Sequence, residues 1–247
     1  MPEEILVRLA GIIRKHPWWL ARARLAVALL KKKGILPPAK VLDAGCGWGV
    51  TLDYLEKAGY QVSGLDISRR ALQQLDRPYR TLYLHDILKP RPENADRFDA
   101  VLALDVIEHI DDDNKAVRAL GAFLGEGGVL IVSVPAMPEL FSEFDAIQGH
   151  RRRYTLETLR SACDDPAAKL ENTFWWGQWM VPLLKRSRHK EVRDKNRPPA
   201  ETYADYLKLP PWPLPALMSL FFWMEEDRAL GERTTQGTSL FAVLRRQ

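Results

Sequence analysis

The chain has 247 residues, of which 46% are hydrophobic and 28% charged, a balance that excludes a disordered tail and a small disulfide-stapled domain. Its 36 Lys and Arg residues against 32 Asp and Glu give a net charge of +4, which by itself is too mild to indicate nucleic-acid binding. The two cysteines, Cys46 and Cys163, show no zinc-site spacing and favour a reducing, cytoplasmic setting.

The N-terminal segment carries acidic residues where a secretory signal would carry basic ones, so we expect no signal peptide. Between residues 3 and 33 apolar positions recur at helical spacing, and Pro17 interrupts them. This pattern predicts two amphipathic helices, which we expect to form a cap over residues 1–38.

Short β-rich runs alternate with helical segments through the next hundred or so residues. We predict strands over 40–44, 61–66, 80–84, 98–103 and 128–134, and helices over 50–58, 68–75 and 114–124. Because parallel strands need crossover connections, this alternation predicts an α/β fold with a mostly parallel sheet and helices on both faces.

The rhythm changes after Pro135. We expect a helix that begins after Thr155 and strands over 169–174 and 239–244, separated by a long stretch rich in Trp, Pro and basic residues. A connection of that length is far above the usual range. The expected parts are therefore a core over 39–174 and 236–247 and an insertion over 175–235 that forms an acceptor-side lid.

A glycine-rich turn, Asp43-Ala44-Gly45-Cys46-Gly47-Trp48-Gly49, follows the first predicted strand. Glycines let the backbone turn sharply and approach a ligand, and the helix that follows offers its N-terminal amides. A dinucleotide-binding turn would place its third glycine at Val50, whereas here it comes one residue earlier. The Gly-x-Gly-x-Gly spacing resembles the first motif of class I S-adenosylmethionine-dependent methyltransferases. Taken alone, the glycines also fit a tight turn that binds nothing.

Further features occur in the order expected of that family. Asp66 ends the second predicted strand, Asp86 follows the third, and the runs 98–104 and 127–132 match the family's fourth and fifth strands. The chain is therefore similar to class I methyltransferases of the bacterial small-molecule type, near the ubiquinone-biosynthesis O-methyltransferase group. The resemblance implies a Rossmann-like, seven-stranded sheet with an antiparallel last strand, and S-adenosyl-L-methionine as cofactor.

The resemblance also implies which residues hold the cofactor. The turn would hold its methionine part, Asp66 its ribose and Asp86 its adenine, with Ala103 beside the sulfonium. Trp48 departs from the small polar residue expected in the turn, and we expect it to pack against the N-terminal helices. The expected cofactor-binding residues are Asp43, Gly45, Cys46, Gly47, Gly49, Asp66, Ile67, Asp86, Ile87, Ala103 and Leu104.

A polar motif, Asp105-Val106-Ile107-Glu108-His109, follows the fourth predicted strand. Spacings of three and four residues place Asp105, Glu108 and His109 on one face if the turn is helical, so we expect them to face the site. Ubiquinone-pathway O-methyltransferases and small-RNA 2′-O-methyltransferases carry Glu-x-x-Glu-His here and are thought to hold a divalent metal. Because Asp105 replaces the first Glu, we expect no metal and take His109 as the first candidate base.

A second polar cluster, residues 142–145 and 149–155, lies after the fifth predicted strand, where a loop would overhang the cofactor. It resembles the Glu-x-Asp…Gly-His-x-Arg-Arg-Tyr-Thr pattern of a bacterial subgroup of these enzymes. His150 is the second candidate base. The adjacent arginines suit an anionic acceptor, or they form a solvated loop with Tyr154 packed beneath it. The expected substrate-binding residues are Trp19, Arg22, Arg152 and Tyr154.

The insertion combines tryptophans with a basic run between Lys185 and Arg197. This composition fits a surface that meets anionic lipid, or a lid over an acyl or isoprenoid acceptor, and it also fits a satellite core. Nucleic-acid binding is disfavoured because no nucleic-acid module is recognised. The longest uncharged stretch, 209–224, is shorter than the roughly 20 residues that a membrane span needs, so only peripheral membrane contact stays open.

We therefore predict an enzyme that transfers a methyl group from S-adenosyl-L-methionine to a small-molecule or lipid-like acceptor, with oxygen favoured as the acceptor atom. Two alternatives stay open. A nicotinamide-dependent oxidoreductase is disfavoured by Val50, and a degenerate methyltransferase fold kept as a binding module is disfavoured by the intact Asp43, Asp66 and Asp86.

Overall fold

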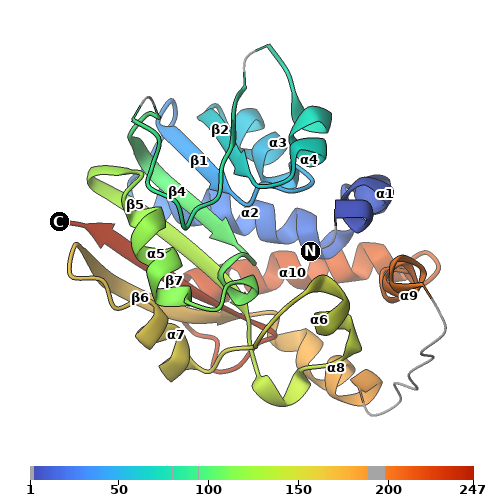
Figure 1. Cartoon of the computed structure of the whole chain (residues 1–247). Helices are drawn as coiled ribbons and strands as arrows, with labels where there is room; N and C mark the ends of the chain where they lie inside the picture. Colours follow the sequence, from blue (N-terminus) through green and yellow to red (C-terminus); the bar gives the residue numbers. More distant parts are fainter. Residues whose placement is uncertain (1–2, 79, 94, 189–197) are drawn as a thin grey trace.

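The computed structural model describes residues 3–247 apart from 79, 94 and 189–197 (Figure 1). Its centre is a seven-stranded sheet in the order β3-β2-β1-β4-β5-β7-β6, in which β7 runs antiparallel to both of its neighbours and the other strands run parallel. The strands are β1 (Lys40–Ala44), β2 (Gln61–Asp66), β3 (Thr81–Leu84), β4 (Phe98–Leu104), β5 (Leu124–Pro135), β6 (Ala168–Trp176) and β7 (Ser239–Arg246).

Helices connect the strands and cover both faces of the sheet. They are α1 (Glu3–Ile13), α2 (Pro17–Lys32), α3 (Val50–Lys57), α4 (Arg69–Leu75), α5 (Asp113–Gly121), α6 (Glu143–Gln148), α7 (Leu156–Ala162), α8 (Val181–Arg188), α9 (Pro199–Tyr206) and α10 (Leu214–Leu230), with short 3-10 turns η1 (Ile107–His109), η2 (Pro138–Leu140) and η3 (Gln178–Met180). On one face Leu29 of α2, Leu52 of α3 and Phe222 of α10 share an apolar cluster. On the other face Val117 of α5 and Leu159 of α7 share a second cluster. In Figure 1, α5 and α7 lie in front of the sheet, and α2 and α10 lie behind it.

The predicted fold class is confirmed, because the sheet is mostly parallel and its last strand is antiparallel. Helices cover both faces of the sheet, so a central strand such as β4 is buried on both sides and its sequence is a continuous apolar run. Every residue of β4 except Asp99 is buried. Asp99 instead accepts a hydrogen bond from the amide of Lys40 at the exposed start of β1, at 2.7 Å.

Four predicted boundaries are wrong by two residues or more, among them the start of β5, at Leu124 instead of 128, and the end of β7, at Arg246 instead of 244. The helix expected over 114–124 ends at Gly121, because Phe123 and Leu124 turn into the core and Leu124 begins β5 opposite Phe98. β6 runs two residues further than expected, since Trp176 is buried and pairs with Ser239. The insertion therefore leaves the sheet after Trp176.

The N-terminal helices and the insertion meet in a third apolar cluster. Ile13 of α1 and Trp19 of α2 pack there with Tyr203 and Leu207 at the end of α9. Tyr203 is fully buried and donates its hydroxyl hydrogen to the Gln148 side chain at 2.9 Å. Segments from both ends of the chain are therefore packed together beside the carboxyl edge of the sheet.

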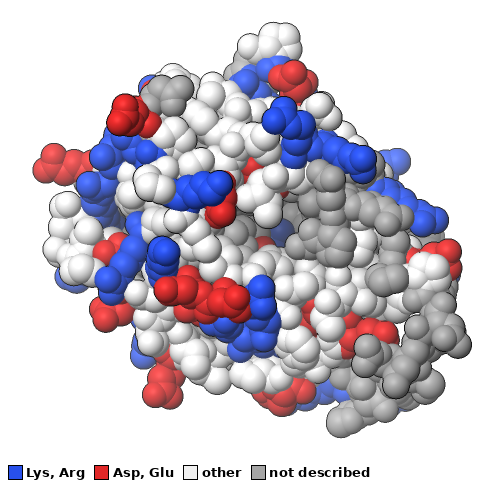
Figure 2. Space-filling model, viewed as in Figure 1, with Lys and Arg blue, Asp and Glu red and all other residues white. Residues whose placement is uncertain are grey.

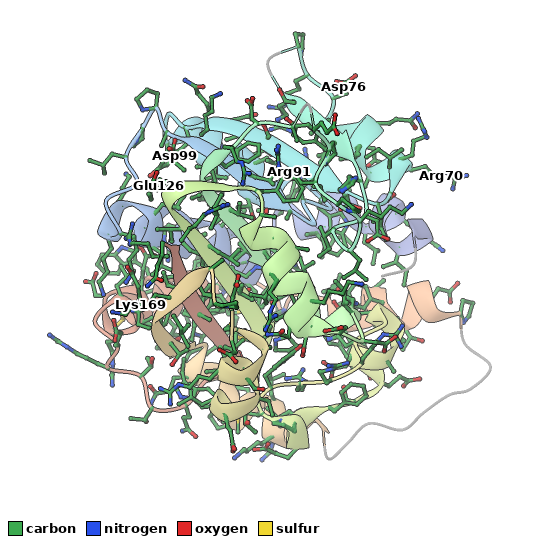
Figure 3. All side chains as sticks on the ribbon, turned by 60° about the vertical axis from the view of Figure 1, so that its left-hand side comes forward. Arg70, Asp76, Arg91, Asp99, Glu126 and Lys169 are labelled. Carbon is green, nitrogen blue, oxygen red and sulfur yellow. The ribbon has the colours of Figure 1, made fainter. Side chains whose placement is uncertain are left out.

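Many of the charged side chains lie on the surface of the molecule. Arg70, Asp76 and Lys169 are exposed and project outward from different edges (Figure 3). Figure 2 shows basic and acidic side chains interspersed on one face, in keeping with the modest net charge of +4. Among the residues that the structure describes, no helix has the length and apolar character needed to cross a bilayer.

We expect the buried side chain of Arg80 to stabilise the contact between α3 and the segment before β3. Its side chain is fully buried, and it donates hydrogen bonds to Asp53 at 2.6 Å and to Glu56 at 2.8 Å on α3. Arg80→Met removes the buried cation from two carboxylates, which are 25% and 16% exposed, so we expect the free energy of unfolding to fall by about 2 kcal/mol, less than for a fully buried pair. Urea denaturation measures this loss.

Arg77→Met is the matched control. Arg77 reaches the same two carboxylates, but its side chain is 40% exposed. Solvent screens such a pair, so the expected loss is below about 1 kcal/mol. Equal losses in the two variants would contradict the assignment of Arg80 as the buried link.

Candidate active site

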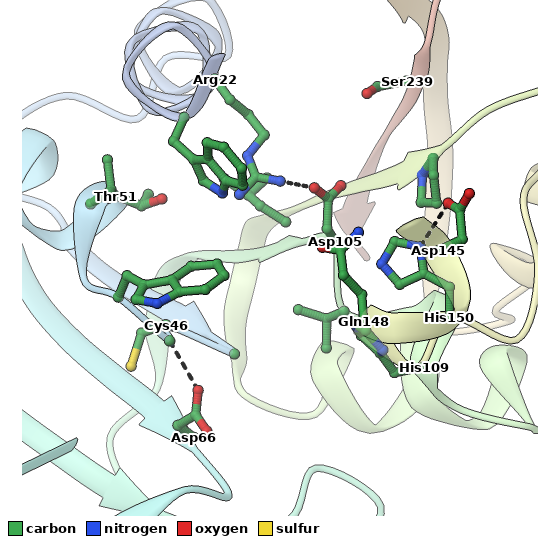
Figure 4. A pocket seen from close by; sticks show the side chains of 18 of the residues that line it. Arg22, Cys46, Thr51, Asp66, Asp105, His109, Asp145, Gln148, His150 and Ser239 are labelled. Atoms are coloured by element: carbon green, nitrogen blue, oxygen red, sulfur yellow. Dashed lines mark hydrogen bonds and ion pairs between the residues drawn. The ribbon is translucent and has the colours of Figure 1, made fainter. Parts of the chain in front are cut away.

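A cavity of about 890 Å³ opens at the carboxyl ends of β1, β2 and β4 (Figure 4). In open parallel sheets ligands bind at this edge, beside the point where the strand order reverses. The walls come from the loops after β1 to β4, from α2, and from the segment between α6 and the end of α9. Cofactor-side and acceptor-side residues therefore share one space.

The glycine-rich turn after β1 forms one wall of the cavity. Gly45, Gly47 and Gly49 have φ angles of 75°, 42° and 71°, a left-handed backbone that other residues rarely adopt. A Cβ atom on Gly45 would also lie 2.6 Å from a methyl carbon of Val106. The backbone conformation and the close packing both require glycine here.

Asp66 fixes this turn from the end of β2. One carboxylate oxygen accepts a hydrogen bond from the Gly47 amide at 2.9 Å, and the other accepts one from the Ser68 amide at 2.8 Å (Figure 4). Ile67 is 75% exposed and borders the cavity, as does Asp86 after β3. The residues to which the resemblance assigns ribose and adenine therefore lie along one side of the cavity.

Asp43 lies in β1 beneath the turn and lines the cavity although it is almost fully buried. Burial raises the pKa of its carboxyl to about 7, and the positive charge of Arg22 opposes this shift. Near neutral pH this carboxyl therefore changes its charge readily, and a cationic ligand would favour the ionised form.

Asp105 follows β4 in a left-handed conformation, with φ of 58°. Its carboxylate forms an ion pair with Arg22 of α2 and accepts a hydrogen bond from the Ser133 hydroxyl at 3.1 Å. The prediction that Asp105, Glu108 and His109 share one helical face is wrong. The helical turn η1 begins only at Ile107, and α2 holds Asp105 away from it.

Glu108 is fully buried, and both of its carboxylate oxygens lack a hydrogen-bond partner among the described residues. Burial raises the pKa of this carboxyl to about 8. The Nε2 atom of His150 lies 3.8 Å from Oε1 of Glu108. Buried polar groups are usually satisfied, so an unsatisfied carboxyl at this place is a candidate for a functional role.

His150 lies between two buried acids. Its Nδ1 atom is 3.1 Å from Oδ1 of Asp145, and the same oxygen accepts a hydrogen bond from Arg153 at 2.9 Å. The His109 ring meets the His150 ring edge-on, with centroids 4.8 Å apart (Figure 4). Burial lowers the pKa of His150, and it lowers the pKa of His109 to about 3. Both imidazoles are therefore neutral near pH 7.

A family model described as a methyltransferase domain matches residues 18–166, more than half of the chain. The chain belongs to this family of methyltransferases. The matched region includes the glycine-rich turn, Asp66 and the loop that carries His150. The resemblance to class I methyltransferases is thereby confirmed, and S-adenosyl-L-methionine is the cofactor of the domain.

Curated relatives match less than half of this methyltransferase. A ubiquinone biosynthesis O-methyltransferase from Alkalilimnicola ehrlichii is 31% identical over 109 residues, which cover 40% of the chain and 43% of that protein. A protein of the same description from Vibrio vulnificus is 30% identical over 116 residues, which cover 44% of the chain and 49% of that protein. The chain thus spans less than half the length of these relatives.

Solved structures share the fold of nearly the whole methyltransferase. A TehB-like SAM-dependent methyltransferase from Corynebacterium glutamicum gives a TM-score of 0.52 at 18% identity, covering 92% of this chain and 88% of that one. The [4+2]-cyclase SpnF gives 0.55 at 15% identity, covering 91% and 80%. These likenesses confirm the fold alone. Since SpnF is described as a cyclase, the fold by itself does not define the reaction.

Most predicted site residues of this methyltransferase border the cavity. On the cofactor side they are Asp43, Gly45, Cys46, Gly47, Asp66, Ile67, Asp86, Ile87 and Leu104, and on the acceptor side Trp19, Arg22, His109 and His150. Trp48 also lies there and meets Trp19 edge-on, with ring centroids 6.0 Å apart, so it packs against α2 as well.

Four predicted site residues lie outside the lining. Ala103 is fully buried in the sheet, and Gly49 begins α3 behind the turn. Tyr154 is buried and donates its hydroxyl hydrogen to Asp113 at 2.8 Å, and Arg152 pairs with the same carboxylate at 3.0 Å. The prediction that Tyr154 and Arg152 bind substrate is therefore corrected, because Asp113 holds both side chains against α5.

Sequence reasoning missed much of the acceptor-side wall. This wall includes Phe144 and Gln148 from α6, and Met180, Leu184, Tyr206 and Leu207 from the insertion. Asp145 and Arg153, which also border the cavity, did carry a signal, since both belong to the Glu-x-Asp…Gly-His-x-Arg-Arg-Tyr-Thr pattern around His150. The others are ordinary apolar and amide residues whose position depends on the path of the insertion.

Glu108, His109 and His150 form a group that could hold a metal. One donor atom from each lies within 4.8 Å of the others, and a carboxylate with two imidazoles suits zinc, iron or manganese. The unsatisfied Glu108 oxygens fit such an ion, although Asp105 is engaged by Arg22. A divalent ion bound there would act as a Lewis acid on an acceptor hydroxyl. The expectation that no metal binds stays a prediction.

Asp66→Ala tests the cofactor side. The change removes the acceptor that fixes the turn and that the resemblance assigns to ribose. Loss of a hydrogen bond to a charged group costs about 1.5–3 kcal/mol, so we expect the Kd of S-adenosylhomocysteine to rise about 10- to 100-fold in calorimetric titration. Asp76→Ala, at an exposed carboxylate after α4, is expected to leave the Kd unchanged. An unchanged Kd in Asp66→Ala would contradict the site.

The raised pKa of Asp43 leads us to expect that the affinity for the cofactor depends on pH. The resemblance places the methionine part of the cofactor against Asp43, where an ionised carboxylate would attract its ammonium group and a protonated one would not. Because the pKa of Asp43 is raised to about 7, the charge is lost as the pH falls through 7. We expect binding to be roughly fivefold weaker at about pH 6 than at about pH 7.5. Asp43→Asn should bind weakly at both pH values, and a flat wild-type profile would contradict the role.

Proposed function

We propose that this methyltransferase methylates a hydroxyl oxygen of an apolar small-molecule or lipid-like acceptor, with His150 as the base. The observation that carries the proposal is the buried pair of His150 and Asp145. The pair borders the same cavity as the glycine-rich turn, so a base and a methyl donor would face one another. Among the described histidines that border the cavity, only His150 has its Nδ1 atom facing a carboxylate.

The size of the cavity supports a second molecule beside the cofactor. Pockets for small ligands usually measure about 300–1,000 Å³, and this one, at about 890 Å³, lies near the upper end. Its acceptor side is lined by Phe144, Met180, Leu184 and Leu207, with Trp19 opposite the turn. Apolar and aromatic walls favour an acceptor with an apolar body and a small polar reacting group.

The chemistry follows from these positions. The acceptor oxygen attacks the methyl carbon in line with the carbon–sulfur bond, and that bond breaks with its electron pair moving to sulfur, which leaves neutral S-adenosylhomocysteine. The hydroxyl proton moves to Nε2 of His150. Holding both reactants in one cavity supplies most of the acceleration, and the base is needed because a hydroxyl must lose its proton.

Asp145 orients the base. Its carboxylate faces Nδ1 of His150 at 3.1 Å, so the proton of the neutral ring lies on Nδ1 and the lone pair lies on Nε2. Burial lowers the pKa of His150, and the hydrogen bond to Asp145 opposes part of this shift. The ring is therefore unprotonated at neutral pH but basic enough to accept a proton.

The descriptions of the curated relatives support oxygen as the acceptor atom. Both describe O-methyltransferases of ubiquinone biosynthesis, at about 30% identity over less than half of either chain. His109, the first candidate base, borders the same cavity with Nδ1 held at 3.1 Å from the Gly149 carbonyl. The carbonyl that holds His109 carries no full negative charge to stabilise a protonated ring, whereas Asp145 does, so His109 is the weaker base of the two.

His150→Ala tests the base assignment. With methyl-labelled cofactor and a series of alkyl-substituted phenols and catechols, we expect kcat to fall about 10²- to 10⁴-fold while the Kd of S-adenosylhomocysteine changes less than about twofold. His109→Ala is the matched control and should lose less than about tenfold. The opposite ranking would transfer the base to His109, and label found only on amines would exclude O-methylation.

Asp145→Asn tests the positioning role. Asn keeps an oxygen that can cap α6, but it removes the charge that orients His150. We expect kcat to fall about 10- to 100-fold with KM nearly unchanged, since substrate contacts stay intact. A loss confined to KM, or to thermal stability, would show that Asp145 serves the fold only.

A further inference from the structure

The first half of α10 presents large apolar side chains to solvent. From Trp212 to Met224 the sequence has no charged residue. Trp212 is 84% exposed and Trp223 61% exposed. We use the name α10 face for the exposed side chains of Trp212, Leu214, Leu217, Leu220, Phe221, Trp223 and Met224. Contiguous apolar surfaces of this kind usually mark an interaction site.

The opposite side of α10 anchors the helix to the core. Phe222 is fully buried and stacks on Trp176 of β6, with ring centroids 5.1 Å apart. Glu225 is buried and accepts a hydrogen bond from the Gln178 amide at 2.7 Å, and Arg24 of α2 pairs with Glu226. The insertion therefore supplies both a core contact and an exposed face, and no other described segment covers that face.

Positive charge lies on α8, and the turn that leads into α8 contacts the α10 face. Trp179 packs against Phe221, with ring centroids 5.5 Å apart, and α8 begins two residues later. Lys185 and Arg186 are exposed on α8, next to Leu183, which is also exposed. Lysine is depleted in protein–protein interfaces, whereas basic side chains beside an apolar surface complement anionic headgroups.

The positions of the tryptophans also favour contact with a membrane surface. Trp212 precedes the first turn of the helix and Trp223 is the last residue but one of the uncharged stretch, so aromatic rings bracket the α10 face. Tryptophan is enriched where a protein crosses from hydrocarbon to headgroups. The uncharged stretch is too short to span a bilayer, but it suits a helix that lies in the plane of the interface.

We propose that the α10 face inserts into the headgroup boundary of an anionic lipid bilayer, with Lys185 and Arg186 against the headgroups. Met180 and Leu184, from the segment that carries these basic residues, line the cavity, so the bilayer would adjoin the acceptor side. Vesicle binding is independent of the proposed reaction, because it needs neither an acceptor nor turnover.

The test is co-sedimentation of the full chain with vesicles. We expect binding to phosphatidylcholine vesicles that contain about one third phosphatidylglycerol, and at least about tenfold weaker binding to phosphatidylcholine alone. The double variant Leu220→Glu, Trp223→Glu should bind the anionic vesicles at least about tenfold more weakly. Lys185→Gln with Arg186→Gln should weaken only the binding to anionic vesicles.

Leu36→Glu is the matched control, because Leu36 is 58% exposed in the connection between α2 and β1. It should bind vesicles as the wild type does. Thermal melting and S-adenosylhomocysteine binding should be unchanged in all variants, which separates loss of contact from loss of fold. Equal vesicle binding by the double glutamate variant, or no binding by the wild type, would overturn the proposal. So would a lipid-free dimer, seen by light scattering, that the double variant disrupts, since a second copy would then cover the α10 face.

Discussion

Parallel pairing of β1 with both β2 and β4 is the constraint on which the site depends. Asp43 lies opposite Gly64 on one side and opposite Leu102 on the other, so the three strands end at the same edge of the sheet. Between parallel strands the chain returns through a crossover from the end of one strand to the start of the next. The loops that leave the carboxyl ends of the strands therefore lie beside one another. The glycine-rich turn, Asp66 and Asp105 border one cavity for this reason, before any side chain interacts with another.

The cofactor half of the site could be predicted because local rules place its residues. Gly45 and Gly47 come directly after a strand, and their positive φ angles need glycine. Asp66 ends the next strand, and the parallel pairing of that strand with β1 brings its carboxylate to the Gly47 amide. Ala103 marks the limit of such reasoning. In a strand buried on both faces, apolar residues occur without alternation, so the sequence does not reveal which side chain faces the edge.

The acceptor half could be predicted only in part, because much of it depends on contacts between distant segments. Arg22 reaches Asp105 across 83 positions of the chain and turns it away from the helical face that its spacing indicates. In the same way, Asp113 holds Tyr154 across 41 positions and removes it from the site. The spacing of residues in the sequence predicts which side chains are neighbours along one helix or strand. A buried charged or polar group must also find a partner, and the fold can supply that partner from a distant segment.

The carboxylate of Asp145 both fixes the start of α6 and orients the candidate base His150. Asp145 accepts a hydrogen bond from the Ser142 amide at 2.9 Å and so caps α6, while its other oxygen faces His150 and Arg153. Arg153 supplies the positive charge that a buried carboxylate needs, so His150 does not have to carry it. Burial, the largest effect, lowers the pKa of His150, the charge of Arg153 lowers it further, and Asp145 raises it. Burial and the arginine together therefore keep His150 unprotonated beside an acid that favours its cationic form, so that the ring can accept a proton from the acceptor.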